Sequence, residues 1–145
     1  MTKRLSAILR LALVSLSLVF CAGNALADYV IRYDGGGDPK DYWDKYVAVR
    51  NTGEPVVIDG KCLSACTLVL SVIPRERICA TNKAALSFHA ARYKGTKVIY
   101  DKSTEIMFKT YPPDIQKWVR EHDALASLEF KTLQGAELKA LIKTC

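Results

Sequence analysis

The residues best suited to chemistry are a serine and a histidine 25 positions apart. Ser64 stands between a short apolar run at residues 56–59 and a longer one that ends at Pro74. His89 lies near the end of another apolar stretch, and imidazole is the right type of group for a general base near neutral pH. A serine held between a buried strand and a buried helix becomes a nucleophile when such a base is adjacent. Serine also caps helices well, so the local sequence leaves a capping role for Ser64 open.

Three consecutive glycines supply a second element of a possible site. Gly35, Gly36 and Gly37 follow an alternating run at residues 29–33 and precede a helical pattern. Glycine adopts positive φ and lets a backbone N–H approach a ligand closely. Their place between a strand and a helix favours an anion-binding turn, and a plain flexible turn is the alternative.

The elements that would position these residues alternate between strands and helices. Asp38, Pro39 and Gly53 predict the start and end of a helix. The β-branched run at residues 56–59 is typical of a buried parallel strand. Strand, helix and strand form a βαβ unit, so the expected fold class is α/β. Further predictions are a buried helix over residues 64–73, short strands at 78–80 and 84–91, a short extended piece at 128–130, and helices at 101–111, from 114 and at 135–142.

The first 27 residues predict a signal peptide. Three basic residues precede an apolar run at residues 11–20, and Ala25-Leu26-Ala27 is a small-residue cleavage site. Cleavage after Ala27 would leave residues 28–145 as one exported domain, periplasmic or secreted in a bacterium, with no membrane span. The net charge of +6 would fall to +3, because the leader carries three basic and no acidic residues. The remaining chain has no basic cluster with aromatics, which argues against nucleic-acid binding.

Four cysteines remain beyond the leader: Cys62, Cys66, Cys79 and Cys145. An even number in an exported protein predicts disulfides, although the sequence does not choose among the three pairings. The Cys62-x3-Cys66 spacing loosely resembles a metal site, the alternative interpretation. Because no second Cys/His pair follows at a matching interval, disulfides are the preferred interpretation, with no metal and no cofactor.

Together, these motifs resemble a known family. Gly35-Gly36-Gly37 after a strand, Gly60-x-x-x-Ser64-Ala65 opening a buried helix, and a strand ending in Phe88-His89 are similar to the Clp protease proteolytic subunit and its crotonase-like superfamily. The closest likeness is to small exported bacterial Clp-like proteins with a Cys-x-Ser-Ala-Cys motif. The resemblance implies a Clp/crotonase-like parallel-sheet core with packed helices, shortened at its N-terminus.

The resemblance also implies roles for individual residues. Ser64 would attack an acyl carbonyl of a peptide or another acyl substrate, and His89 would accept its proton. The backbone N–H of Gly37 or Gly36, with that of Ala65, would form the oxyanion site. The family's late aspartate has no clear counterpart: Glu129 is the substitute, Asp114 and Asp123 are weaker ones, and a bare Ser-His dyad is equally allowed.

Two function hypotheses follow from the sequence. The first is an exported serine hydrolase, specifically a peptidase. The second is a non-catalytic secreted module that keeps the disulfide-stapled scaffold for binding or structure. The missing acid separates the two hypotheses, and the sequence leaves a homo-oligomer open.

Overall fold

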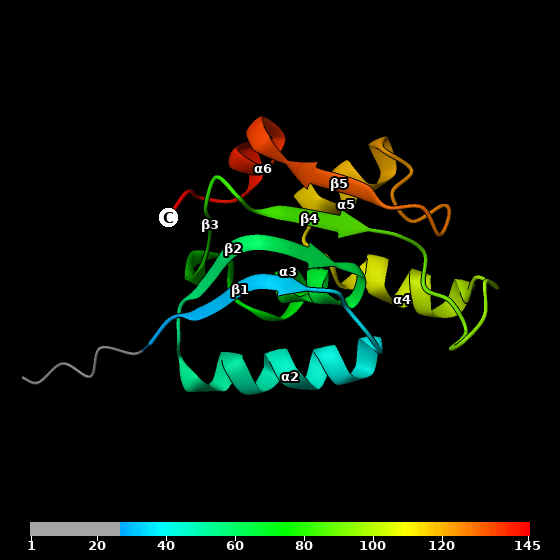
Figure 1. Ribbon diagram of the computed structural model, residues 1–145, viewed down its shortest axis with the longest axis horizontal. Coiled ribbons are helices and arrows are strands. Elements are labelled where there is room, and N and C mark those ends of the chain that lie inside the picture. Colours follow the sequence, from blue (N-terminus) through cyan, green and yellow to red (C-terminus); the bar gives the residue numbers. More distant parts are fainter. Residues whose placement is uncertain (1–26) are drawn as a thin grey trace, which may run out of the picture.

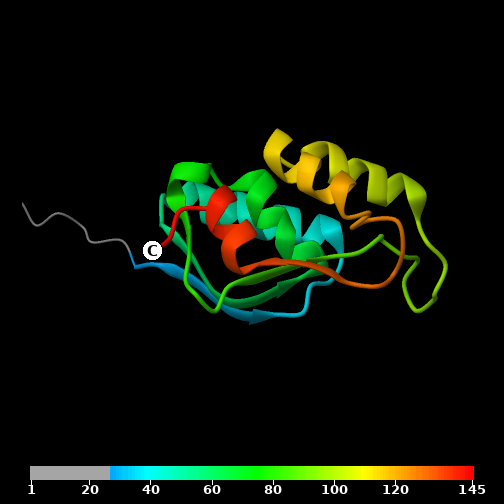
Figure 2. The same cartoon turned by 90° about the horizontal axis from the view of Figure 1, so that it is seen from above.

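The computed structural model describes residues 27–145 as a sheet with helices on one of its faces (Figures 1 and 2). The strands are β1 Tyr29–Asp34, β2 Val56–Leu63, β3 Ile78–Ala80, β4 Ala85–Phe88 and β5 Lys131–Gln134. The α-helices are α2 Pro39–Thr52, α3 Val69–Val72, α4 Asp101–Thr110, α5 Pro113–Glu121 and α6 Gly135–Leu141, and 3-10 turns span Ser64–Leu68 and Arg75–Arg77. The predicted signal peptide lies almost wholly outside the described residues.

The sheet is mostly parallel and has the order β1-β2-β4-β5, with β3 alongside the first half of β2. Strands β1, β3 and β4 all run parallel to β2, and only β5 is antiparallel, on β4. The α/β class is therefore confirmed. Strand β5 was not predicted, because Leu133 is its single buried residue and no alternation marks it.

Helix α2 forms where its capping residues predict it. The Asp38 side chain accepts the Lys40 N–H, Pro39 occupies the first turn, and Gly53 ends the helix with a φ of 83°. Its aromatic side chains differ in burial: Tyr46 is fully buried against the core, whereas Trp43 is 38% exposed. The helix connects β1 to β2. Because these strands pair in parallel, with Asp34 opposite Cys62, the end of β1 lies beside the start of the Ser64 turn.

Strand β2 is longer than its apolar run because it continues through a bulge to Leu63. The register with β1 shifts between Ile31↔Ile58 and Tyr33↔Lys61. At this point a Cβ on Gly60 would lie 1.8 Å from the Arg32 carbonyl oxygen, so only glycine fits. A bulge of this kind bends the strand and changes the direction in which the side chains after it point. The strand then carries the chain directly into Ser64.

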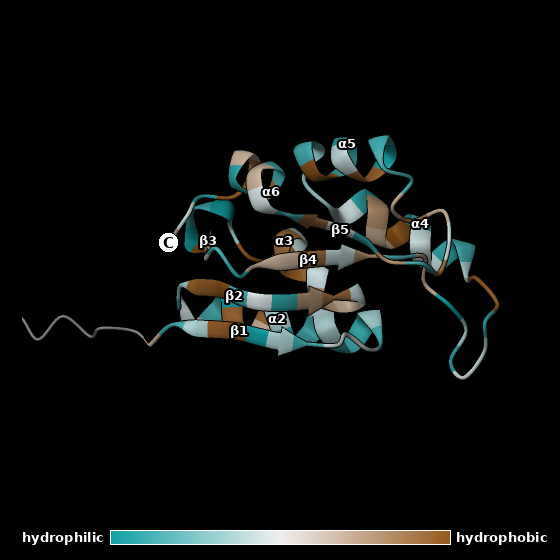
Figure 3. Cartoon of the chain, turned by 45° about the horizontal axis from the view of Figure 1, so that its top comes forward, coloured by the Kyte–Doolittle hydropathy of each residue, from teal (hydrophilic) through white to brown (hydrophobic). Residues whose placement is uncertain are grey.

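The core lies between the sheet and the helices. Figure 3 shows α5 with apolar turns facing inward and polar turns outward, and its Ile115, Trp118 and Val119 are buried. Phe88 contacts both Trp118 and Tyr111, with ring centroids 5.4 and 5.6 Å apart. This packing fixes the end of β4, where His89 follows. Among residues 27–145, no helix has the length and apolarity needed to cross a membrane.

Both predicted disulfides form, pairing Cys62 with Cys66 and Cys79 with Cys145. The cysteines are thus bridged and not available as metal ligands. No cluster of three or more metal-binding side chains occurs in the described part of the chain. The second bridge ties the C-terminal residue to β3, across 66 positions of sequence.

Replacing both Cys79 and Cys145 by serine is expected to lower the free energy of unfolding by about 4 kcal/mol, the typical effect of closing a loop of this length. Urea denaturation of the oxidised wild type and the double variant measures the difference. Identical midpoints, or four alkylatable thiols in protein purified from its native compartment, would contradict the bridge.

Candidate active site

Ser64 and His89 meet at the carboxyl ends of β2 and β4. These neighbouring strands run parallel, and Leu63 pairs with Ser87, so the residues that follow each strand leave the sheet at the same edge. His89 Nε2 lies 2.7 Å from Ser64 Oγ. Both residues were predicted from the sequence as a nucleophile and base, and in the structure they are in hydrogen-bond contact. The geometry is that of a nucleophile and a general base.

Ser64 has a left-handed backbone conformation, with φ of 55°. Such a φ is uncommon for a residue with a Cβ and costs roughly 1 to 3 kcal/mol when the surrounding structure enforces it. Ser64 starts a 3-10 turn rather than the expected α-helix, and the α-helical part begins only at Val69. No side-chain capping bond forms at this helix start, so the hydroxyl is directed to His89 and not to a helix N–H.

Two interactions hold the backbone of Ser64 in this conformation. The Cys62–Cys66 bridge spans it, and both cysteines are fully buried. Thr67 donates its hydroxyl to the Ser64 carbonyl at 2.7 Å and shares a 2.6 Å hydrogen bond with the Tyr111 hydroxyl. Burial raises the pKa of Tyr111 above its ordinary value, so Tyr111 stays protonated and can donate to Thr67.

The glycine turn packs closely against Ser64. A Cβ on Gly36, whose φ is 76°, would lie 2.5 Å from the Leu63 carbonyl oxygen and 2.7 Å from Ser64 Cβ. The Gly36 N–H donates to Asp34 Oδ1 at 3.0 Å, so it is not the free oxyanion donor that was expected. Gly36 instead permits the close approach of two backbones. Gly37 lines the cleft, and Ala65 N lies beside the turn, so these two N–H groups remain the oxyanion candidates.

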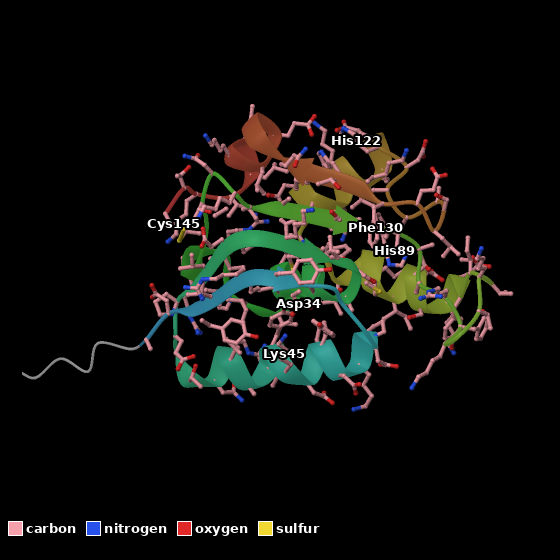
Figure 4. The ribbon with its side chains drawn as sticks, in the orientation of Figure 1. Asp34, Lys45, His89, His122, Phe130 and Cys145 are labelled. Atoms are coloured by element: carbon pink, nitrogen blue, oxygen red, sulfur yellow. A yellow bond between two sulfur atoms is a disulfide. The ribbon has the colours of Figure 1, made fainter. Side chains whose placement is uncertain are left out.

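Asp34 anchors the glycine turn, a role that the sequence analysis missed. Its carboxylate accepts the Gly36 N–H, the Tyr42 hydroxyl and, at 2.8 Å, Lys45 Nζ. Figure 4 shows Asp34 and Lys45 facing each other between β1 and α2. Burial opposes ionisation, but the bonds from Lys45 and Tyr42 hold the pKa of Asp34 below its ordinary value. An aspartate two positions before a glycine in a turn signals this capping of the backbone.

The His89 imidazole is half-buried and neutral at pH 7. Burial lowers its pKa, the Ala90 backbone opposes this shift slightly, and the positive charge of Arg92 lowers the pKa further. Phe130 packs edge-on against the imidazole, with centroids 4.7 Å apart, and Figure 4 shows the two side by side. A neutral imidazole is the form that can accept a proton.

Within residues 27–145, no carboxylate bonds to the His89 imidazole. His89 Nδ1 is buried and has no hydrogen-bond partner within residues 27–145. Glu129, the expected substitute for the acid, has an exposed side chain that lines the cleft. The side chain that packs against the His89 imidazole is that of its neighbour, Phe130. Asp114 is engaged with Arg75 instead. The site is therefore a Ser-His pair, one of the two arrangements that the sequence allowed.

The pair opens into a cleft of about 1300 Å³. The glycine turn and the start of α2 form one wall, and residues 91–100 with α4 form the other. Leu128, Glu129 and Phe130 complete the lining.

No model of a known protein family matches the chain. No curated protein matches it at a significant level either.

Ser64→Gly is expected to be about 1 kcal/mol more stable than Ser64→Ala, because only glycine adopts a positive φ without crowding its Cβ. Both variants lose the hydroxyl, so the difference isolates the backbone. Ser103 in α4 provides the matched control, since alanine is the more stable of the two in a helix. Chemical denaturation measures all four variants. An alanine variant at position 64 as stable as the glycine variant would contradict the left-handed conformation.

Proposed function

We propose that this protein is a serine hydrolase that acts by acyl transfer, with Ser64 as nucleophile and His89 as base. The observation that carries the proposal is the 2.7 Å contact between Ser64 Oγ and His89 Nε2. The left-handed Ser64 adds support, because backbone strain of this kind clusters at functional sites. The hydroxyl and the imidazole both line the open cleft, where a substrate can reach them.

In the proposed reaction, Ser64 Oγ attacks a substrate carbonyl while His89 Nε2 takes the hydroxyl proton. The carbonyl oxygen becomes an oxyanion, for which the Gly37 and Ala65 N–H groups are the proposed donors. The tetrahedral intermediate collapses, the leaving group receives the proton from His89, and an acyl-Ser64 ester remains. Water, deprotonated by His89, then hydrolyses the ester and restores the site.

The proposed pair acts without a carboxylate behind the histidine. In a triad an acid holds the imidazole in one tautomer and orientation. Here burial, the hydrogen bond to Ser64 and the Phe130 ring would orient it. The lowered pKa keeps the base unprotonated at neutral pH. Without a stabilising carboxylate, we expect slower turnover than a full triad gives.

We propose a peptide as the substrate and a Clp/crotonase-like fold as the scaffold. The cleft exceeds the roughly 300 to 1000 Å³ of small-molecule sites, which suits an extended chain. The parallel sheet, the glycine turn at β1 and the serine turn after β2 follow the order of that family's motifs. The two disulfides support export to an oxidising compartment.

A non-catalytic binding or structural module is the second candidate. The observation that favours it is the unpartnered His89 Nδ1, because loss of the supporting acid weakens catalysis. On this reading the cleft binds a chain without cleaving it, and Ser64 would not react with an active-site probe.

A fluorophosphonate probe is expected to label the wild type at Ser64. Ser64→Ala should lose labelling completely, and His89→Ala should react about 100-fold more slowly, the typical contribution of a general base. Ser103→Ala, another serine in the same cleft, is the control and should label like the wild type. Gel fluorescence over time gives the rates. Folded wild type that does not react, or labelled Ser64→Ala, would contradict the proposal.

The labelling rate should fall as the pH decreases through the pKa of folded His89, which burial lowers below the ordinary value of 6.5, and should level off at higher pH. Protonation removes the lone pair that accepts the Ser64 proton. Phe130→Ala exposes the ring, so its half-maximal rate should occur at a higher pH than in wild type. Labelling reactions quenched at fixed times between pH 4.5 and 8 measure the rate as a function of pH for the wild type and for Phe130→Ala. A half-point above 6.5 in wild type would exclude a buried His89 as the base.

A further inference from the structure

A hairpin at residues 91–100 forms the outer wall of the cleft, beyond the carboxyl end of β4 (Figure 1). It closes through two backbone bonds, Tyr93 N to Val98 O at 3.0 Å and Tyr100 N to Ala91 O at 2.8 Å. Tyr93 and Tyr100 stack with centroids 4.5 Å apart. The hairpin is thus an ordered structure that presents its side chains in defined places.

Three cations on this hairpin face the cleft without counter-charges. Arg92, Lys94 and Lys97 are exposed and line the cleft. Within the described part of the chain, none of them has a carboxylate oxygen within 4.0 Å, and Arg92 only donates to the Thr96 carbonyl. Five lysines elsewhere form ion pairs (Lys40, Lys45, Lys83, Lys109 and Lys117) and others do not, so the feature specific to the hairpin is that its three unpaired cations lie together in the cleft lining.

Within residues 27–145, the acidic residues of the opposite wall form no ion pair with these three cations. Asp38 is the cap of α2 and accepts the Lys40 N–H at 2.8 Å. Asp41 lies in the first turn of the same helix, where the helix dipole stabilises a carboxylate. Lys40 itself is paired with Asp44. Glu129 also lines the cleft, so the cleft carries charge of both signs, and its positive charge is concentrated on the hairpin, in Arg92, Lys94 and Lys97.

The positive charge reaches the reacting atoms. Arg92 follows His89 by three residues, and both line the cleft. Its charge contributes to the lowered pKa of His89, so the guanidinium acts electrostatically on the imidazole. A substrate carboxylate bound by Arg92 would lie in the same cleft as the acyl group under attack.

We propose that residues 92–97 form a specificity subsite for a carboxylate, so that the protein acts on acyl substrates, in particular acidic peptides, with a negative charge next to the scissile bond. The inference rests on the proposed hydrolase function and names its substrate class. Arg92 is the principal contact, because guanidinium binds carboxylate in a bidentate manner. Lys94 and Lys97 raise the local concentration of anions at the cleft mouth.

A matched pair of sulfonyl fluorides tests this subsite. 4-(Fluorosulfonyl)benzoate carries a carboxylate where 4-methylbenzenesulfonyl fluoride carries a methyl group. In each reaction Ser64 Oγ forms a bond to sulfur, the S–F bond breaks, fluoride leaves and His89 takes the hydroxyl proton. The measured quantity is the ratio of the two second-order labelling rates, anionic over neutral, which removes effects common to both probes.

The ratio is expected to fall about fivefold in Arg92→Gln, the size of a well-placed exposed ion pair. Lys139→Gln on α6 removes the same charge outside the cleft and should leave the ratio unchanged. Because surface charges are screened by ions, the wild-type ratio should also decrease as salt is raised to 1 M. The Lys94→Gln/Lys97→Gln variant should lower the ratio with Arg92 intact.

Competitor peptides identify the source of the carboxylate. Three peptides are compared as inhibitors of labelling. The first is amidated and has an internal Glu, the second has Gln in place of that Glu, and the third is the Gln peptide with a free C-terminus. Protection by the Glu peptide supports an acidic side chain, and protection only by the free C-terminus assigns the subsite to terminal carboxylates.

A ratio that is equal in wild type and Arg92→Gln, with Ser64 labelled by both probes, would overturn the subsite and leave the hydrolase intact. Absence of Ser64 labelling by either probe would instead remove the hydrolase proposal and the subsite with it. The two failures are thus distinguished in one experiment.

Discussion

The close approach of two backbones at Gly36 and Ser64 is the constraint on which the site depends. A side chain at Gly36 would collide with the Leu63 carbonyl and with Ser64 Cβ, so position 36 must be glycine. Ser64 in turn takes a left-handed conformation that few non-glycine residues adopt. Neither feature is stable in isolation, and the parallel pairing of β1 with β2 brings them together.

The rest of the fold holds this contact from both sides. On the β1 side, Asp34 binds the Gly36 N–H and is itself bound by Tyr42 and Lys45 of α2. On the β2 side, the Cys62–Cys66 bridge and Thr67 restrain the Ser64 turn. Tyr46 joins the two sides, because it lies on the buried face of α2 and its hydroxyl donates to Cys66 Sγ at 3.4 Å. The hydroxyl is therefore presented to His89 by a rigid support.

Local signals explain what could be predicted from the sequence. Asp38, Pro39 and Gly53 mark α2, and the β-branched run marks the start of β2, because capping and burial act within a few residues. The even cysteine count predicted both bridges. The contacts missed are long-range or conformational: β5, the Phe130 ring on His89, and the use of the Gly36 N–H by Asp34. Glu129 was predicted as the supporting acid from its position in the chain alone. Sequence position does not reveal that this side chain is exposed.

In the proposed mechanism His89 Nε2 accepts the Ser64 proton, which requires a neutral imidazole with its own proton on Nδ1. That Nδ1 has no partner within residues 27–145, so the tautomer is the decisive property. Two-bond ¹H–¹⁵N NMR of the imidazole at pH 7.5, assigned with His89→Gln, reads the tautomer directly. The proposed mechanism predicts protonated Nδ1 and unprotonated Nε2. A proton on Nε2, in a neutral ring or in an imidazolium, would contradict it.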